Sequence, residues 1–423
     1  MTHDALGIVP ANLLLPADGV SPAAWACVAC DQYTSQPDYW EDVALLVGAQ
    51  PSTLRLMLPE CYLEQSASRV PAIHQAMRDY LQSGILTQAV TDGFILVERS
   101  TESGARLGLV CAVDLEQYDF TPGSKSLVRP TEETIAARLP ARMAIRQGAA
   151  IELSHILLLM DDPLQSVVEP LYACRASLPL LYDFPLMKEG GHLRGWAVTG
   201  AEDKARIRKA LALLKSAQGA DPLLFAVGDG NHSLATAKRC WEQLKPALTP
   251  QERLTHPARY ALCEVENIHD GALLFEPIHR VLTGVRPDEV MTDWTLCCHQ
   301  RGMDLSEATA PDETEHTLRV IYHGHEAVAT VSKPDGALPA DTLQRYLDDF
   351  LARRPEADID YIHGDDVVRQ LCQREDAMGF LLPPLDKADF FPAIRRLGVL
   401  PRKTFSMGHA NEKRFYMECK MIL

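Results

Sequence analysis

Residues 225–238 read Phe-Ala-Val-Gly-Asp-Gly-Asn-His-Ser-Leu-Ala-Thr-Ala-Lys, and no other stretch restricts the fold of this chain as much. The apolar run before the glycines is typical of a buried strand, and Leu234, Ala237 and Trp241 recur at helical spacing up to Pro246. The sequence therefore predicts a strand, a two-glycine turn and a helix. Because the first-turn N–H groups of a helix lack partners within it, they favour an anion such as phosphate or carboxylate.

The polar residues of this turn are the first candidates for a site. Asp229 can hold Mg²⁺ or accept a proton from a substrate hydroxyl, and His232 can orient a substrate or donate a proton. Gly230, Asn231 and Ser233 are then expected to contact a phosphate or the substrate. The alternative is ordinary helix capping with a locally hydrogen-bonded histidine. The pattern is neither a Gly-x-Gly-x-x-Gly fingerprint nor a Walker loop.

A second candidate is a group of arginines upstream of this turn. Arg129 is followed by Arg138, Arg142 and Arg146, and the last three are spaced four apart, which places them on one face of a helix. Guanidinium groups bind phosphate oxygens in a bidentate manner, so we predict an anion site here. The alternative is a solvated face that pairs with neighbouring glutamates.

The segment near residue 30 is rich in polar and aromatic side chains but poor in charge. Such a segment makes a weak core element and a suitable ligand-facing loop, with Asp31, Gln32 and Tyr33 as its candidate contacts. The alternative is the capped start of a helix at Pro37.

Composition excludes several classes of protein. The formal net charge of −16 over 423 residues opposes a general nucleic-acid surface, which needs clustered Lys and Arg. No N-terminal signal and no uncharged apolar span of membrane length is evident, so we expect a cytoplasmic protein without a membrane partner. The 11 cysteines are scattered, which predicts reduced thiols. Cys27 and Cys30 have chelating spacing, but a structural zinc site needs two such pairs.

Hydrophobic periodicity predicts an α/β (α+β) fold with mixed sheets in two or three packed lobes. Helices are expected over residues 66–82 and 201–217, and a β-hairpin around residues 102–104. We place an N-terminal α/β lobe with the arginine-rich helix at 1–200, the strand–turn–helix core at 201–288 and a C-terminal α/β lobe at 289–423.

Several motifs resemble those of one known family. The turn Asp-Gly-Asn-His-Ser (229–233) resembles an Asp-Gly-His-His-Arg signature, and Arg-Pro-Thr-Glu-Glu-Thr (129–134) resembles Arg-Pro-His-Glu-x-Thr. Residues 276–281, 378–382 and 400–404 resemble its later Pro-x-His-Arg, strand and Pro-x-Lys-Ser/Thr segments. The chain is thus identified as a member of the DUF1015 family, whose function is unassigned. The signature is in turn similar to that of the ParB/sulfiredoxin-like nucleotide-binding superfamily, which includes free L-serine kinases.

The resemblance transfers only some of the signature. Asp229 and His232 match it, whereas Asn231 replaces a histidine, Ser233 replaces the arginine and Thr131 replaces a histidine. Another arginine must then bind the phosphate, or this chain must bind a ligand different from that of the family members with the arginine. Three further binding residues are implied by the resemblance alone: His279, Arg280 and Lys403.

The resemblance implies a nucleotide-dependent phosphotransferase that uses ATP or ADP with Mg²⁺ and acts on a small hydroxyl metabolite. Free L-serine is the first substrate to test, with Asp229 as the metal ligand or base. The alternative is a non-catalytic sensor that binds a nucleotide or metabolite in the same site. A DNA-binding role like that of ParB is opposed by the acidic composition.

Overall fold

Two adjacent strands, β3 (Leu86–Thr101) and β4 (Gly104–Asp114), supply alternate side chains to two hydrophobic cores. In β3, Ile95 belongs to one core while Leu96 belongs to the other, and in β4 Val110 and Leu109 are divided in the same way. Side chains of a strand point alternately to the two faces of a sheet, so both faces of this sheet are buried.

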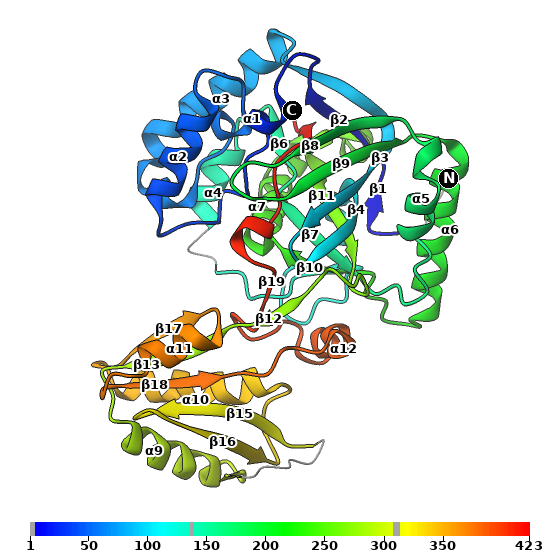
Figure 1. Cartoon of the computed structure of the whole chain (residues 1–423). Coiled ribbons are helices and arrows are strands. Elements are labelled where there is room, and N and C mark those ends of the chain that lie inside the picture. Colours follow the sequence, from blue (N-terminus) through cyan, green and yellow to red (C-terminus); the bar gives the residue numbers. More distant parts are fainter. Residues whose placement is uncertain (1–4, 136–138, 308–313) are drawn as a thin grey trace. The chain divides into compact units, whose positions relative to one another are not determined.

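The computed structural model describes residues 5–135, 139–307 and 314–423. They form two compact units, 1–274 with 408–423 and 275–407 (Figure 1). Within the described residues, no helix is long and apolar enough to cross a membrane.

The first unit is built on one large mixed sheet. Its main path runs β5 (Val128–Arg129), β10 (Phe225–Asp229), β7 (Ile156–Met160), β11 (Tyr260–Asn267), β4, β3, β2 (Ala11–Pro16), β20 (Cys419–Met421) and β6 (Ile151–Leu153). Additional strands are β1 (Ile8–Val9), β8 (Leu180–Pro185) and β9 (His192–Val198). The pairs β10–β5 and β11–β7 are parallel, whereas β10–β7 and β11–β4 are antiparallel. The α/β prediction with mixed sheets is therefore confirmed.

Helices cover the two faces of this sheet. Trp40 of α2 (Pro37–Val47) and Met77 of α3 (Ser66–Gln82) lie in the core that contains Ile95. The other core contains Leu211 of α6 (Ala201–Ala217) and Trp241 of α7 (Asn231–Leu244). The remaining helices of the unit are α1 (Pro22–Trp25), α4 (Leu139–Arg146), α5 (Glu169–Ala173) and α8 (Pro250–Thr255). The helices expected at 66–82 and 201–217 are present.

The second unit has its own sheet and cores. The strand order is β14 (Asp304–Ser306), β16 (His325–Ser332), β15 (His316–Tyr322), β18 (Ala377–Leu381), β13 (His279–Thr283) and β17 (Asp358–Ile362), and the pairs are antiparallel. A small ladder joins β12 (Phe275–Pro277) to β19 (Phe405–Met407). The helices are α9 (Pro287–Gln300), α10 (Pro339–Arg353), α11 (Asp365–Leu371) and α12 (Lys387–Leu397).

The boundaries of the two units lie at other residues than those of the three lobes expected from the sequence. Strand β10 of the expected 201–288 core pairs with β5 and β7 of the expected N-terminal lobe, so both belong to one sheet. The last 16 residues also belong to the first unit, because β20 lies between β2 and β6.

Candidate functional site

The candidate site begins at the turn between β10 and α7. Gly230 precedes the helix with a φ of 80°, a left-handed conformation that glycine adopts without strain. A Cβ at this position would lie 3.0 Å from Cδ2 of His155 and 3.2 Å from Cα of Ile156. The glycine therefore lets the chain turn into α7 in direct contact with the segment between β6 and β7.

Asp229 is held by two donors at the start of this turn. Its Oδ1 accepts a hydrogen bond from the Gly230 N–H at 2.9 Å, and its Oδ2 lies 3.3 Å from Nζ of Lys413. Burial by itself raises the pKa of Asp229, but Lys413, His155 and the Gly230 N–H outweigh it and lower the pKa below its ordinary value. Asp229 is thus an ionised carboxylate at neutral pH.

His155 lies at the centre of the polar groups. Its Nδ1 is 2.5 Å from the Tyr416 hydroxyl oxygen, which also accepts a hydrogen bond from the Cys30 N–H at 3.0 Å. Its Nε2 lies 3.7 Å from Oδ2 of Asp31. Burial by itself lowers the pKa of His155, but Asp31, Cys30 and Asp229 outweigh burial and raise the pKa to about 10. The imidazole is therefore protonated at neutral pH, with a proton on each nitrogen: Nδ1 faces the Tyr416 hydroxyl and Nε2 forms an ion pair with Asp31.

The site thus alternates carboxylates and cations. Asp31 and Asp229 carry negative charge, and His155 and Lys413 carry positive charge. Such an arrangement can orient a hydroxyl group on a carboxylate while the adjacent cations and the N-terminus of α7 attract an anion.

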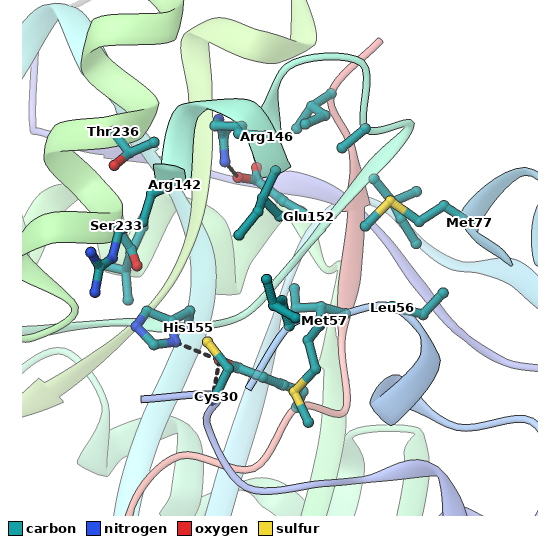
Figure 2. A pocket seen from close by; sticks show the side chains of 18 of the residues that line it. Cys30, Leu56, Met57, Met77, Arg142, Arg146, Glu152, His155, Ser233 and Thr236 are labelled. Atoms are coloured by element: carbon teal, nitrogen blue, oxygen red, sulfur yellow. Dashed lines mark hydrogen bonds and ion pairs between the residues drawn. The ribbon is translucent and has the colours of Figure 1, made fainter. Parts of the chain in front are cut away.

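A cavity of about 160 Å³ adjoins this group. Polar lining residues include Cys30, Arg142, Arg146, Glu152, His155 and Ser233, and the apolar ones include Leu56, Met57, Leu58, Met77, Ile151 and Ile156 (Figure 2). Arg142 is paired with Glu60, and Arg146 lies 2.7 Å from Glu152. Both guanidinium groups are therefore already matched by carboxylates.

The other predicted residues of the turn have distinct contacts. Asn231 is buried; its Oδ1 accepts from the Thr131 N–H at 2.9 Å, and its Nδ2 donates to the Thr131 hydroxyl at 3.0 Å. Nε2 of His232 accepts from the Ile135 N–H at 3.4 Å. Ser233 lines the cavity. Asn231 and Thr131 thus join the turn to the 131 loop, where the family signature has two histidines.

The predicted loop at residue 30 contributes to the site mainly through Asp31. Gln32 donates from Nε2 to Oδ1 of Asp31 at 3.0 Å and so fixes its carboxylate. Tyr33 stacks on Tyr39 with ring centroids 3.6 Å apart. The alternative reading also applies nearby, because α2 begins at Pro37.

The predicted arginine stripe is only partly described. Arg138 lies outside the described residues, and Arg142 is at the cavity. Arg129 is buried, ion-paired with Asp221 and bonded to the Ser126 carbonyl at 3.0 Å. These contacts indicate a structural role for Arg129, which stabilises the chain around β5.

Three predicted residues belong to the second unit and have partners there. Nδ1 of His279 accepts from the Leu382 N–H at 3.1 Å, and its Nε2 lies 2.9 Å from Asp365. Arg280 is fully buried and donates to the Arg402 carbonyl at 3.1 Å. Lys403 is exposed on a turn with a φ of 57°.

Sequence reasoning did not find His155, Lys413 or Tyr416. One available signal was the polar Ser-His pair that interrupts the apolar run 151–160; another was the basic and aromatic run Lys-Arg-Phe-Tyr at 413–416. Neither signal indicates that the two segments meet.

Metal ligands are sparse in the part of the chain that the structure describes. It contains no group of three or more His, Cys, Asp or Glu side chains placed to hold a metal ion. Both Asp229 oxygens already have donors, one of them the Lys413 ammonium. The residues present therefore do not form a protein cage for Mg²⁺. All 11 cysteines are free, and burial raises the pKa of Cys27.

The fold and site define an α/β protein with a strand–turn–helix site that combines carboxylates and cations beside a small cavity. The chain belongs to DUF1015, a family of proteins of unknown function, whose model matches residues 14–350. No curated protein matches the sequence.

Solved structures with partial likeness were also found. A free serine kinase in complex with AMP is 11% identical with a TM-score of 0.40, over 72% of this chain and 90% of that one. A conserved hypothetical protein from Pyrococcus furiosus is 12% identical with a TM-score of 0.37, over 72% and 93%. SbnI from Staphylococcus aureus, truncated at its C-terminus, is 10% identical with a TM-score of 0.35, over 71% and 82%.

Proposed function

We propose that this protein transfers a phosphoryl group from ATP or ADP to the hydroxyl of a small metabolite. The observation that carries the proposal is the position of Asp229, an ionised carboxylate at the N-terminus of α7 with Lys413 and His155 around it. The likeness of residues 229–233 to the signature of a superfamily that includes free L-serine kinases makes L-serine the first substrate to test.

Each group has a role in this proposal. Asp229 orients the substrate hydroxyl and accepts its proton as the hydroxyl oxygen bonds to the terminal phosphorus of ATP or ADP and the P–O bond to the departing ADP or AMP breaks. Lys413, protonated His155 and the N–H groups of α7 balance the charge on the phosphoryl oxygens. Phosphoryl transfer depends mainly on such positioning and neutralisation, so a carboxylate with a lowered pKa suffices as the orienting group. Any Mg²⁺ would enter with the nucleotide phosphates, as is usual for this ion.

The test is ³¹P NMR with ATP or ADP, Mg²⁺ and a panel of hydroxyl amino acids. We expect a new phosphomonoester signal with the wild type and a loss of at least roughly 10²-fold in rate with Asp229→Asn. The matched control is Asp42→Asn. Asp42 is an exposed carboxylate that forms an ion pair with Lys188 at 2.7 Å, and it does not line the cavity. Equal rates for Asp229→Asn and the wild type would remove Asp229 from catalysis.

A second candidate function is a sensor that binds a nucleotide or metabolite without turnover. It is favoured by the pairing of Arg142 with Glu60 and Arg146 with Glu152, and by Ser233 where the signature has arginine, because fewer guanidinium groups are then available to a phosphate. Stabilisation of the protein against heat by a nucleotide, without product in the NMR assay, would identify the sensor.

A further inference from the structure

The cavity lined by His155 and by the first turns of α7 has a polar end and an apolar end. In Figure 2, His155, Ser233 and Thr236 lie on one side of it, whereas Leu56, Met57 and Met77 lie on the other. The polar end adjoins the β10–α7 turn, since the Gly230 backbone packs against His155. A ligand whose polar groups lie at His155 and Ser233 therefore directs the rest of its body toward apolar side chains.

The charged groups of the cavity wall already form ion pairs, and the one group of these with a buried unpartnered nitrogen among the described residues is Arg146, at Nη2. Arg142 is matched by Glu60, and Glu152 is matched both by Arg146 at 2.7 Å and by Lys420 at 3.1 Å. A charged ligand tail would have to displace one of these partners and would be desolvated, which is unfavourable. The wall therefore favours an uncharged tail.

The volume sets the size of that tail. A dry, apolar cavity of about 150 Å³ in another protein accommodates benzene, and the cavity here measures about 160 Å³. The hydroxymethyl side chain of serine would leave most of this volume unfilled, and unfilled apolar volume forfeits dispersion contacts.

We infer that the cavity selects a small hydroxy acid whose uncharged apolar chain has about four to six carbons, with its carboxylate toward His155 and the first turn of α7. This rests on the proposed function, which places the hydroxyl at Asp229. It goes further in naming a substrate class that is larger and more apolar than serine.

Ligand occupancy can be measured without turnover through Cys30. Cys30 lines the cavity and is partly buried, and Figure 2 shows its sulfur directed toward His155. A bound ligand should shield it from iodoacetamide, whereas the exposed Cys174 should react at an unchanged rate and serves as the reference within the same chain. Peptide mass spectrometry gives both rates.

The probes share amino, carboxyl and hydroxyl groups and differ only in the apolar substituent on the hydroxyl-bearing carbon. They are L-serine, L-threonine, 3-hydroxynorvaline, 3-hydroxyleucine and 3-phenylserine. Each added carbon should lower the concentration for half-protection of Cys30 about fourfold, the equivalent of ~0.8 kcal/mol per buried methylene. Three added carbons then give roughly sixtyfold. Equal half-protection by all five probes, or strongest protection by serine, would overturn the inference.

Two variants test the cavity in opposite directions. Ala149→Leu places a larger side chain at a buried lining position and so makes the cavity smaller. It should weaken the protection of Cys30 by 3-hydroxyleucine at least tenfold and leave the protection by serine unchanged. Met77→Ala enlarges the cavity and should shift the preference toward 3-phenylserine. Unaltered preferences in both folded variants would contradict the inference, and if one variant does not fold the other still decides.

The two proposals can fail separately. Graded protection of Cys30 without phosphomonoester formation would overturn the phosphotransferase and support the selection of apolar chains. Phosphoryl transfer to serine, with equal protection of Cys30 by all five probes, would support the phosphotransferase and overturn the selection of apolar chains.

Discussion

At the scale of single residues, His155 connects the two carboxylates of the site. Asp31 lies beside its Nε2, Asp229 adds to the negative potential around it, and Nδ1 meets the Tyr416 hydroxyl. A buried imidazole is usually neutral, because burial lowers its pKa. Here the surrounding negative groups prevail, so the protonated form is part of the folded structure.

This charge predicts a pH dependence of stability. The pKa of His155 is raised from an ordinary value near 6.5 to about 10, so between these values the folded chain binds a proton that the unfolded chain does not. The stabilisation is fully present below pH 6.5 and is lost as pH rises through about 10. Between these pH values, the free energy of unfolding in urea should fall with rising pH more steeply for the wild type than for His155→Gln, by up to roughly 1.4 kcal/mol per pH unit.

The control for this measurement is His325→Gln, at an exposed position in β16. That variant should follow the wild-type pH dependence. Parallel curves for wild type and His155→Gln over pH 7–10 would show that His155 is not protonated in the folded protein.

The residues of the site could be predicted only where the signal was local. Asp229 and Ser233 follow from the strand–turn–helix pattern, and Asp31 follows from a polar loop. His155 and Lys413 are 258 positions apart in the chain, and only the sheet brings both near Asp229. No spacing rule records such a contact.

At the scale of elements, the β10–turn–α7 segment could be predicted from the sequence because each of its parts has a distinct residue pattern. An apolar run forms the buried strand, two glycines allow the turn, and helical periodicity begins immediately afterwards. The place of β20 between β2 and β6 could not be predicted, because a strand of three residues shows little hydrophobic pattern and strand pairing is non-local.

Substitution of Gly230 tests whether this turn positions the site. Gly230→Ala imposes the left-handed φ of 80° on alanine and adds a Cβ at 3.0 Å from His155. The matched control is Gly219→Ala, where φ is 73° and a Cβ would meet nothing within 4 Å. The strain, about 1–2 kcal/mol, is common to both variants.

The contact with His155 and Ile156 is particular to Gly230. We therefore expect Gly230→Ala to lose roughly 1–3 kcal/mol more stability in urea than Gly219→Ala, and to shift the NMR signals of the His155 imidazole. Equal losses and an unshifted imidazole would mean that the turn does not hold His155.

At the scale of the whole molecule, the chain leaves the first unit after residue 274 and returns at residue 408. The lobe boundary expected at residues 288–289 lies 14 residues after the first crossing. The return at residue 408 was not expected from the sequence, because it depends on the pairing of β20 with β2 and β6 in the sheet of the first unit. Residues 275–407 thus form a unit inserted between the two segments of the first unit.

The insertion predicts that the first unit can fold without the second. Phe275 and Met407 are directly opposite in the antiparallel β12–β19 pair, and such partners have Cα atoms about 4.5–5.5 Å apart. Residues 274 and 408 therefore lie within reach of a short connection, and closing a short loop costs little entropy. Replacing residues 275–407 with a Gly-Ser linker should leave a cooperatively folded chain with the Asp229–Lys413 pair intact.

Circular dichroism and urea unfolding of this shortened chain provide the measurement, with residues 275–407 expressed alone as the counterpart. One sharp transition for each fragment is expected, since each unit has its own hydrophobic cores. A shortened chain without a cooperative transition would mean that the second unit is needed for the first to fold. In that case the return of the chain at residue 408, and with it the delivery of Lys413 to Asp229, would depend on the inserted unit rather than on the sheet that contains β20.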